Sequence, residues 1–124
     1  MHQRTLSLTL LAAVFLVIGD AVLQIAAVGA LPATSAQWAD LAKPEIVNAL
    51  TFIVVMVVAG MSSISFAPIA GLVVSALVSN GMHRWIVGPG FTPLTMVVHI
   101  ILFLLLGWMG LWLAAVFLGK KSSS

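Results

Sequence analysis

The sequence predicts an all-α integral membrane protein, folded as a small bundle of four transmembrane helices. Of its 124 residues, 62% are hydrophobic and 6% are charged, whereas soluble domains average roughly 45–50% and 25%. The apolar residues form long stretches, separated by short segments that contain proline, glycine or hydroxyl side chains. The middle stretch, Pro44–Gly81, would be on the order of 55 Å long as one helix, against roughly 30 Å for the hydrocarbon core of a bilayer. It therefore has to contain two helices.

The first span is expected at residues 5–30. The basic start Met1–Arg4 and the apolar body that follows also resemble a secretory signal, with a candidate cleavage site at Val28–Ala30. The apolar run of about 26 residues is longer than a typical signal core and long enough to cross a membrane. We therefore expect it to be retained as a span that ends at Leu31–Pro32.

The second span is preceded by a segment that is too polar for the membrane interior. Residues 33–43 are expected at the membrane surface, with Ser35 as the cap of a short helical turn and Trp38 at the interface. Pro44–Glu45 then opens a helix over residues 45–61. Proline is tolerated in a first helical turn, and a carboxylate there meets the positive end of the helix dipole.

The third and fourth spans are bounded by clear start and stop signals. The third is expected at residues 65–80, with Ser65 as its cap and Asn80–Gly81 as its end. The fourth is expected at residues 93–118, with Thr92–Pro93 as cap and first helical residue. Each of the two middle spans has about 16–17 residues, close to the lower limit for crossing a bilayer. Three spans, or two spans plus a re-entrant hairpin, are therefore alternatives.

The chain forms a single transmembrane domain, residues 1–124. Four spans would put both termini on one side of the membrane, together with the basic residues Arg4, Lys120 and Lys121. Lys43 and Arg84 would lie on the other side. The positive-inside rule then makes the termini cytoplasmic, by a margin of one basic residue. We expect the membrane to be an inner membrane of the bacterial type.

Asp20 is the most informative polar side chain because it lies about midway along the first span. An ionisable group there is costly unless it faces protein, water or a partner. Gln24 follows four residues later, on the same helix face. The functional interpretation is a proton- or cation-binding site. The structural interpretation is a hydrogen bond between helices, to Asn48 or to one of the serines at positions 62, 63 and 65.

His99 is the candidate cofactor ligand, because it lies within the fourth span. A neutral imidazole in a membrane helix can ligate a heme iron or a chlorophyll magnesium, and it can donate a hydrogen bond to a quinone. The structural alternative is a hydrogen bond to a neighbouring helix. The sequence identifies no cofactor beyond the heme or chlorophyll hypothesis at this position.

His83, Arg84 and Trp85 follow one another in the segment between the last two predicted spans. We expect this segment to be a loop. The three side chains could bind an anionic lipid headgroup or a protein partner there. They are also typical of the residues that anchor a membrane protein at the interface.

Composition and motifs exclude several function classes. The chain has no cysteine, which excludes disulfides, thiolate metal sites and a cysteine nucleophile. No nucleophile–base pair, phosphate-binding loop or cluster of metal ligands is present, so we expect neither catalytic residues nor a metal site. The net charge of +2 comes from scattered basic residues rather than a basic stripe, so nucleic acid is not an expected partner.

Three functional hypotheses remain. Few polar side chains and short loops favour an accessory or structural subunit of a larger respiratory, photosynthetic or transport complex in the membrane, without catalytic activity of its own. The alternative is a small homo-oligomeric proton-coupled transporter or channel that uses Asp20. The third is a subunit that contacts heme, chlorophyll or quinone through His99. The expected partners are the lipid bilayer and either other membrane subunits or further copies of the chain.

Overall fold

The structure, a computed structural model, describes residues 2–61 and 67–123. The described residues contain no β-strand, which confirms the all-helical prediction. Their elements, in chain order, are α1 (His2–Val28), α2 (Ser35–Met61), α3 (Ala67–Val87), the 3-10 turn η1 (Gly88–Gly90) and α4 (Pro93–Ser123). The predicted turn at Ser62–Ser65, with its cap Ser65, lies outside the described residues.

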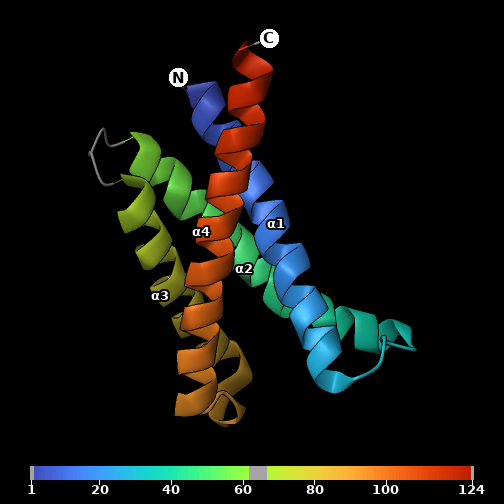
Figure 1. The fold of residues 1–124 in the computed structure, drawn as a ribbon. Coiled ribbons are helices and arrows are strands. Elements are labelled where there is room, and N and C mark those ends of the chain that lie inside the picture. Colours follow the sequence, from blue (N-terminus) through green and yellow to red (C-terminus); the bar gives the residue numbers. More distant parts are fainter. Residues whose placement is uncertain (1, 62–66, 124) are drawn as a thin grey trace.

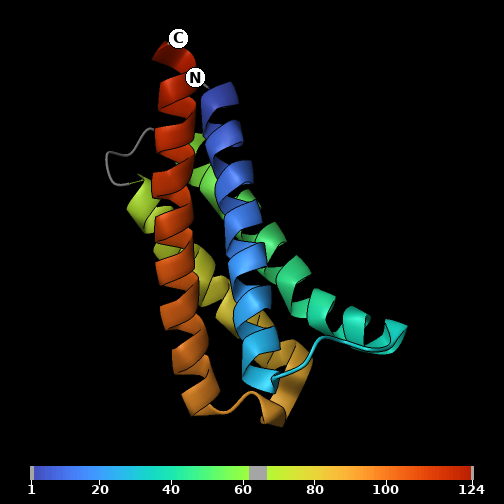
Figure 2. The ribbon, with the colours of Figure 1, turned by 45° about the vertical axis from the view of Figure 1, so that its right-hand side comes forward.

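The four helices form a bundle in which both chain termini lie at the same end (Figure 1). The α1–α2 and α3–α4 connections lie at the opposite end (Figure 2). Around the bundle, α1 contacts α2 and α4, and α3 also contacts α2 and α4. Side chains of α2 and α4 meet across the centre, where the rings of Phe52 and Phe103 lie 6.1 Å apart.

Among the described residues, three helices are long and apolar enough to cross a membrane: Leu6–Val28 in α1, Ser35–Ala59 in α2 and Pro93–Gly119 in α4. Helix α3 has 21 residues and carries Asn80 and several other polar residues in its last two turns. Helix α3 is not among the three candidate spans. Three long apolar helices are compatible with an integral membrane location.

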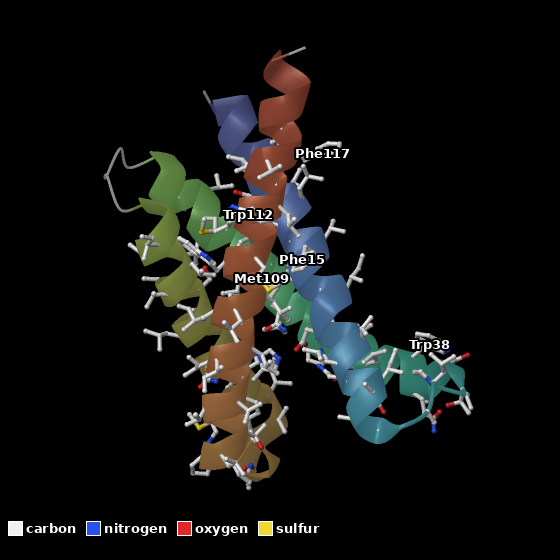
Figure 3. All side chains as sticks on the ribbon, in the orientation of Figure 1. Phe15, Trp38, Met109, Trp112 and Phe117 are labelled. Atoms are coloured by element: carbon white, nitrogen blue, oxygen red, sulfur yellow. The ribbon has the colours of Figure 1, made fainter. Side chains whose placement is uncertain are left out.

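Helix α2 begins at Ser35, so the predicted separation of the surface segment 33–43 from the second helix is wrong. The helix continues through Pro44. Proline leaves the carbonyl of Asp40 without its helical N–H partner. Asp40 is exposed, so solvent or headgroups can satisfy that carbonyl. The first turns of α2 project from the bundle (Figure 1), and Trp38 lies in this projecting part (Figure 3).

Threonine side chains cap α2 and α4. The backbone N–H of Gln37 donates to Thr34 Oγ1 at 3.2 Å, so Thr34 takes the role predicted for Ser35. At the start of α4, the N–H of Thr95 donates to Thr92 Oγ1 at 3.3 Å. The prediction that Thr92 caps the last helix is confirmed.

Helix α3 does not stop at Asn80–Gly81 as predicted, but continues to Val87. The Asn80 side chain donates to α4 instead of capping its own helix. The residue after the helix is Gly88, whose φ of 74° lies in the left-handed region that favours glycine. Gly29, with φ of 85°, ends α1 in the same way, two residues before the predicted Leu31–Pro32.

The half of the bundle that holds the termini has an apolar core. Its buried side chains come from all four helices: Ala12, Ala13, Leu16, Phe52, Met56, Leu72, Ala76 and Phe103. Glycines bring the helices close together here. A Cβ atom added at Gly110 of α4 would lie 2.9 Å from the carbonyl oxygen of Ala12 in α1.

Candidate functional site

A layer of polar side chains fills the other half of the bundle, toward the α1–α2 and α3–α4 connections. We call this group the polar layer: Asp20, Gln24, Glu45, Asn48, Ser79, Asn80, His83 and His99. Asp20 lies eight residues before the end of α1 at Val28, which corresponds to about 12 Å along the helix. Every helix contributes at least one member, so the layer depends on the whole bundle.

Three members of the layer form a carboxyl cluster: Asp20, Gln24 and Glu45. The Gln24 amide nitrogen donates to Asp20 Oδ2 at 2.8 Å and to Glu45 Oε1 at 3.1 Å. These two bonds use both of its hydrogens. The two carboxyl groups are close enough to interact electrostatically. One amide thus bridges an acid on α1 and an acid on α2.

The carboxyl cluster lacks a compensating cation among the residues that the structure describes. Asp20 is 8% exposed and Glu45 is 4% exposed. Lys43 lies near in sequence but pairs with Asp40 at 4.0 Å on the surface. Glu45 Oε2 is buried and has no hydrogen-bond partner in the described part of the chain. A buried oxygen without a partner is costly, so the site favours a proton or a cation at that atom.

A cavity lies beside Gln24, the bridging residue of the carboxyl cluster. Its volume is about 380 Å³, and it lies beside the α1–α2 connection. Gln24 lines its wall, together with the polar side chains Gln37 and Asp40. The bridging amide is therefore the part of the cluster that faces this opening.

The second part of the layer joins α2, α3 and α4 through His99. Asn48 Oδ1 accepts from Ser79 Oγ at 2.6 Å and from His99 Nε2 at 3.0 Å. The Asn80 amide nitrogen donates to the carbonyl of Met96 at 2.9 Å and to His99 Nδ1 at 3.0 Å. All four bonds are satisfied when His99 is neutral and carries its hydrogen on Nε2.

His83 lies in α3 and not in a loop as predicted, because that helix continues past Gly81. It is buried, and its Nδ1 lies 2.7 Å from the carbonyl oxygen of Ser79. The ring centroids of His83 and His99 are 4.4 Å apart. The two rings are in direct contact, which leaves no space for a heme between them.

Arg84 and Trp85 have separate roles in the structure. Arg84 Nη1 donates to the carbonyls of Gly88 and Phe91, at 2.7 and 3.3 Å, and so fastens the connection between α3 and α4. Trp85 is 80% exposed. Its ring is therefore free to meet lipid or a partner, as an interfacial anchor would.

The structure brings together most of the residues that the sequence singled out, but in two groups. Asp20 bonds to Gln24 and not to Asn48, which belongs to the histidine network. Glu45 was not among the candidate site residues, because the sequence placed it in the first turn of a helix. Its signal was the spacing to Asn48, three residues later, which puts both side chains on one face of α2.

The arrangement of the described residues bears on the metal and on the cofactor hypothesis at His99. The described residues contain no group of three or more His, Asp or Glu side chains that could hold a metal ion. Both nitrogens of His99 are hydrogen-bonded to asparagines. A heme or chlorophyll at His99 would have to replace one of these bonds.

Comparison with known proteins gives no family for this chain. No family model matches it, and no significant match is found among curated proteins or solved structures. Its function is therefore argued from the polar layer.

Proposed function

We propose that this protein is a small proton-coupled membrane transporter or channel subunit, in which the carboxyl cluster binds and releases a proton. One observation carries the proposal: Asp20 and Glu45 are both buried and share one bridging amide, without a cation in contact among the described residues. Two ionised carboxylates this close repel each other strongly in a medium of low dielectric constant. One proton shared by the pair removes that repulsion and supplies a donor for Glu45 Oε2.

The proton reaches the cluster through the cavity at Gln24. Three polar side chains in its otherwise apolar lining, Gln24, Gln37 and Asp40, can hold water next to the bridging amide. Toward the termini, the apolar core that contains Phe52 and Phe103 separates the cluster from the other end of the bundle. A site open to one side and closed to the other is the arrangement that alternating access requires.

In the proposed topology all four helices cross the membrane, with both termini in the cytoplasm. Helix α3 crosses as part of the bundle, with the polar side chains of Ser75, Ser79, Asn80 and His83 buried. The cavity at Gln24 then opens on the side away from the cytoplasm. The small size of the chain favours a homo-oligomer, in which each copy contributes one carboxyl cluster.

Proton flux into proteoliposomes tests this proposal. The purified protein is reconstituted with a pH-sensitive dye inside the vesicles, and a potassium diffusion potential drives proton entry. We expect Glu45→Gln and Asp20→Asn each to lower the flux at least tenfold. Lys43→Gln is the control, because Lys43 is an exposed charged residue near the same end of the bundle and does not line the cavity at Gln24. It should leave the flux within twofold of the unmodified protein.

Infrared difference spectroscopy provides a readout that does not depend on a transported substrate. A carboxyl group that loses its proton loses its C=O stretching band and gains a carboxylate band. We expect this exchange when the pH is raised, and we expect it to change in Glu45→Gln and in Asp20→Asn, because each variant leaves a single carboxyl group in the cluster. Equal flux in all three variants, together with unchanged spectra, would refute the proton-binding role.

A second candidate function is that of an accessory subunit of a larger membrane complex. The observation that favours it is the exposed aromatic face of α4. Trp108, at the midpoint of that helix, is 54% exposed. Trp112, one turn later (Figure 3), is 62% exposed. Tryptophan prefers the membrane interface, where its N–H finds an acceptor. At mid-helix, a neighbouring protein subunit could supply that acceptor.

Purification in a mild detergent separates the two functions. An accessory subunit would co-purify with other chains in fixed stoichiometry, and Trp108→Leu would weaken that association. The complex would stay assembled and active in Asp20→Asn. A homo-oligomer that carries proton flux by itself would instead favour the transporter.

A further inference from the structure

A second cavity, separate from the one at Gln24, lies between the start of α2 and the end of α3. Its volume is about 430 Å³, which is within the range of sites for small organic ligands. Its wall is almost entirely aliphatic, formed by Pro44, Ile46, Val47, Ile86 and Val87. We call it the α2–α3 cleft. A lining of this kind favours an apolar molecule.

His83 is the buried polar side chain that lines the α2–α3 cleft. Its Nδ1 lies 2.7 Å from the carbonyl oxygen of Ser79, one turn earlier in the same helix. A carbonyl oxygen can only accept, so Nδ1 carries the hydrogen and donates it. In the neutral ring, Nε2 is then an acceptor, and it has no hydrogen-bond partner in the described part of the chain.

The ring of His83 is held in this orientation by its neighbours. It packs against His99 at 4.4 Å and against Phe91 at 5.7 Å between ring centroids. Because Nδ1 bonds to its own helix, Nε2 is the ring nitrogen that is left for a ligand in the cleft that His83 lines. The cleft thus offers one fixed acceptor beside an aliphatic wall.

The charged residues near the cleft do not select a charged ligand. Asp40 and Lys43 also line it, but they pair with each other at 4.0 Å, and both side chains are largely exposed. Their charges cancel at the mouth. The polar end of a ligand is therefore selected by His83, through a hydrogen bond to Nε2.

We propose that the α2–α3 cleft binds a lipophilic molecule whose polar end is a neutral O–H donor, of the class of quinols and other long-chain phenols. The O–H group donates to His83 Nε2, and the apolar body lies against the aliphatic wall. A quinone of the same shape has only acceptors at its polar end, so it cannot make this bond. The cleft therefore prefers the reduced molecule over the oxidised one. This inference rests on His83 and not on the carboxyl cluster.

A matched pair of probes tests the preference: a benzoquinol with a ten-carbon tail and the corresponding quinone, each titrated into the full chain in lipid nanodiscs without oxygen. We expect the quinol to bind at least tenfold more tightly, about the effect of one hydrogen bond of 1.4 kcal/mol. His83→Phe keeps an aromatic ring against His99 and Phe91 but removes the acceptor. It should lower the affinity for the quinol to that of the quinone.

Ile86→Trp is the second variant, because it fills the cleft from its exposed wall and leaves His83 in place. It should abolish binding of both probes. In ¹⁵N spectra of the unmodified protein, the Nε2 resonance of His83 should shift on addition of the quinol and not on addition of the quinone. Equal affinities for the two probes, or a preference for the quinol that persists in His83→Phe, would overturn the proposal.

Discussion

The two halves of the bundle hold the same four helices together by different means. Toward the termini, the helices meet through apolar side chains and glycine, and Gly110 of α4 lies against the backbone of Ala12 in α1. Toward the connections, they meet through hydrogen bonds between side chains, such as those that Asn48 accepts from α3 and α4. The first half depends on shape, and the second on matched donors and acceptors.

The contrast has a physical reason in a membrane. Lipid tails are as apolar as leucine, so helices associate through close packing and through hydrogen bonds rather than by the hydrophobic effect. Where helices pack closely, a substitution by a larger side chain is the most disruptive change, because it forces the helices apart. A polar layer tolerates changes of size better than the loss of one donor or acceptor. The predictions below compare the two halves by the free energy of unfolding, measured by titration with SDS from mild detergent micelles.

The largest effect is expected in the packed half. Gly110→Leu places a side chain where an added Cβ would already lie 2.9 Å from the Ala12 carbonyl oxygen. We expect a loss of about 3 kcal/mol or more, because α1 and α4 have to separate. The control is Gly81→Leu, where no atom lies within 4 Å of the added Cβ. A similar loss of unfolding free energy in both variants would contradict close packing of α1 against α4 at Gly110.

In the polar half, Asn48→Leu should cost about 2 to 4 kcal/mol. The substitution removes the acceptor of both Ser79 Oγ and His99 Nε2, and each buried group without a partner costs about 1–3 kcal/mol. The double variant Asn48→Leu with His99→Leu should cost less than the sum of the two single changes. Strict additivity would contradict the direct bond between these side chains.

A smaller effect is expected for Asn80→Leu, about 1 kcal/mol. Asn80 donates two hydrogen bonds, but one acceptor is the Met96 carbonyl, which also lies within the backbone ladder of α4. The other acceptor, His99 Nδ1, is only partly buried. Val78→Leu, at an exposed position two residues earlier, should change the unfolding free energy by less than about 0.5 kcal/mol. Equal losses of unfolding free energy in the two variants would contradict a stabilising role for the hydrogen bonds of Asn80.

The smallest effect is expected at the surface of the projecting part of α2. Lys43→Ala breaks the contact with Asp40, in which both side chains are largely exposed. Exposed ion pairs contribute about 0.2–1 kcal/mol and are screened by salt. We expect a loss below about 0.5 kcal/mol that disappears at high salt. A loss as large as that of Asn48→Leu would mean that Lys43 compensates the carboxyl cluster.

Only some residues of the candidate site could be predicted from the sequence. Asp20 and Gln24 were found because a spacing of four residues places them on one face of a single helix. Glu45 was missed because its position beside Pro44 also fits a helix start, and only the continuation of α2 back to Ser35 puts it inside a long helix. His83 was assigned to a loop because Asn80–Gly81 is a frequent helix end.

The sequence by itself determined the all-helical class, the helix period and the apolar character of the long segments, because these follow from composition and from local signals such as Thr92–Pro93. The tertiary structure decided which polar side chains meet. Asn48 and His99 are 51 residues apart in the chain and still share a hydrogen bond. Contacts of that kind depend on the rotation of each helix about its axis, and in this bundle side chains from several helices fix that rotation together.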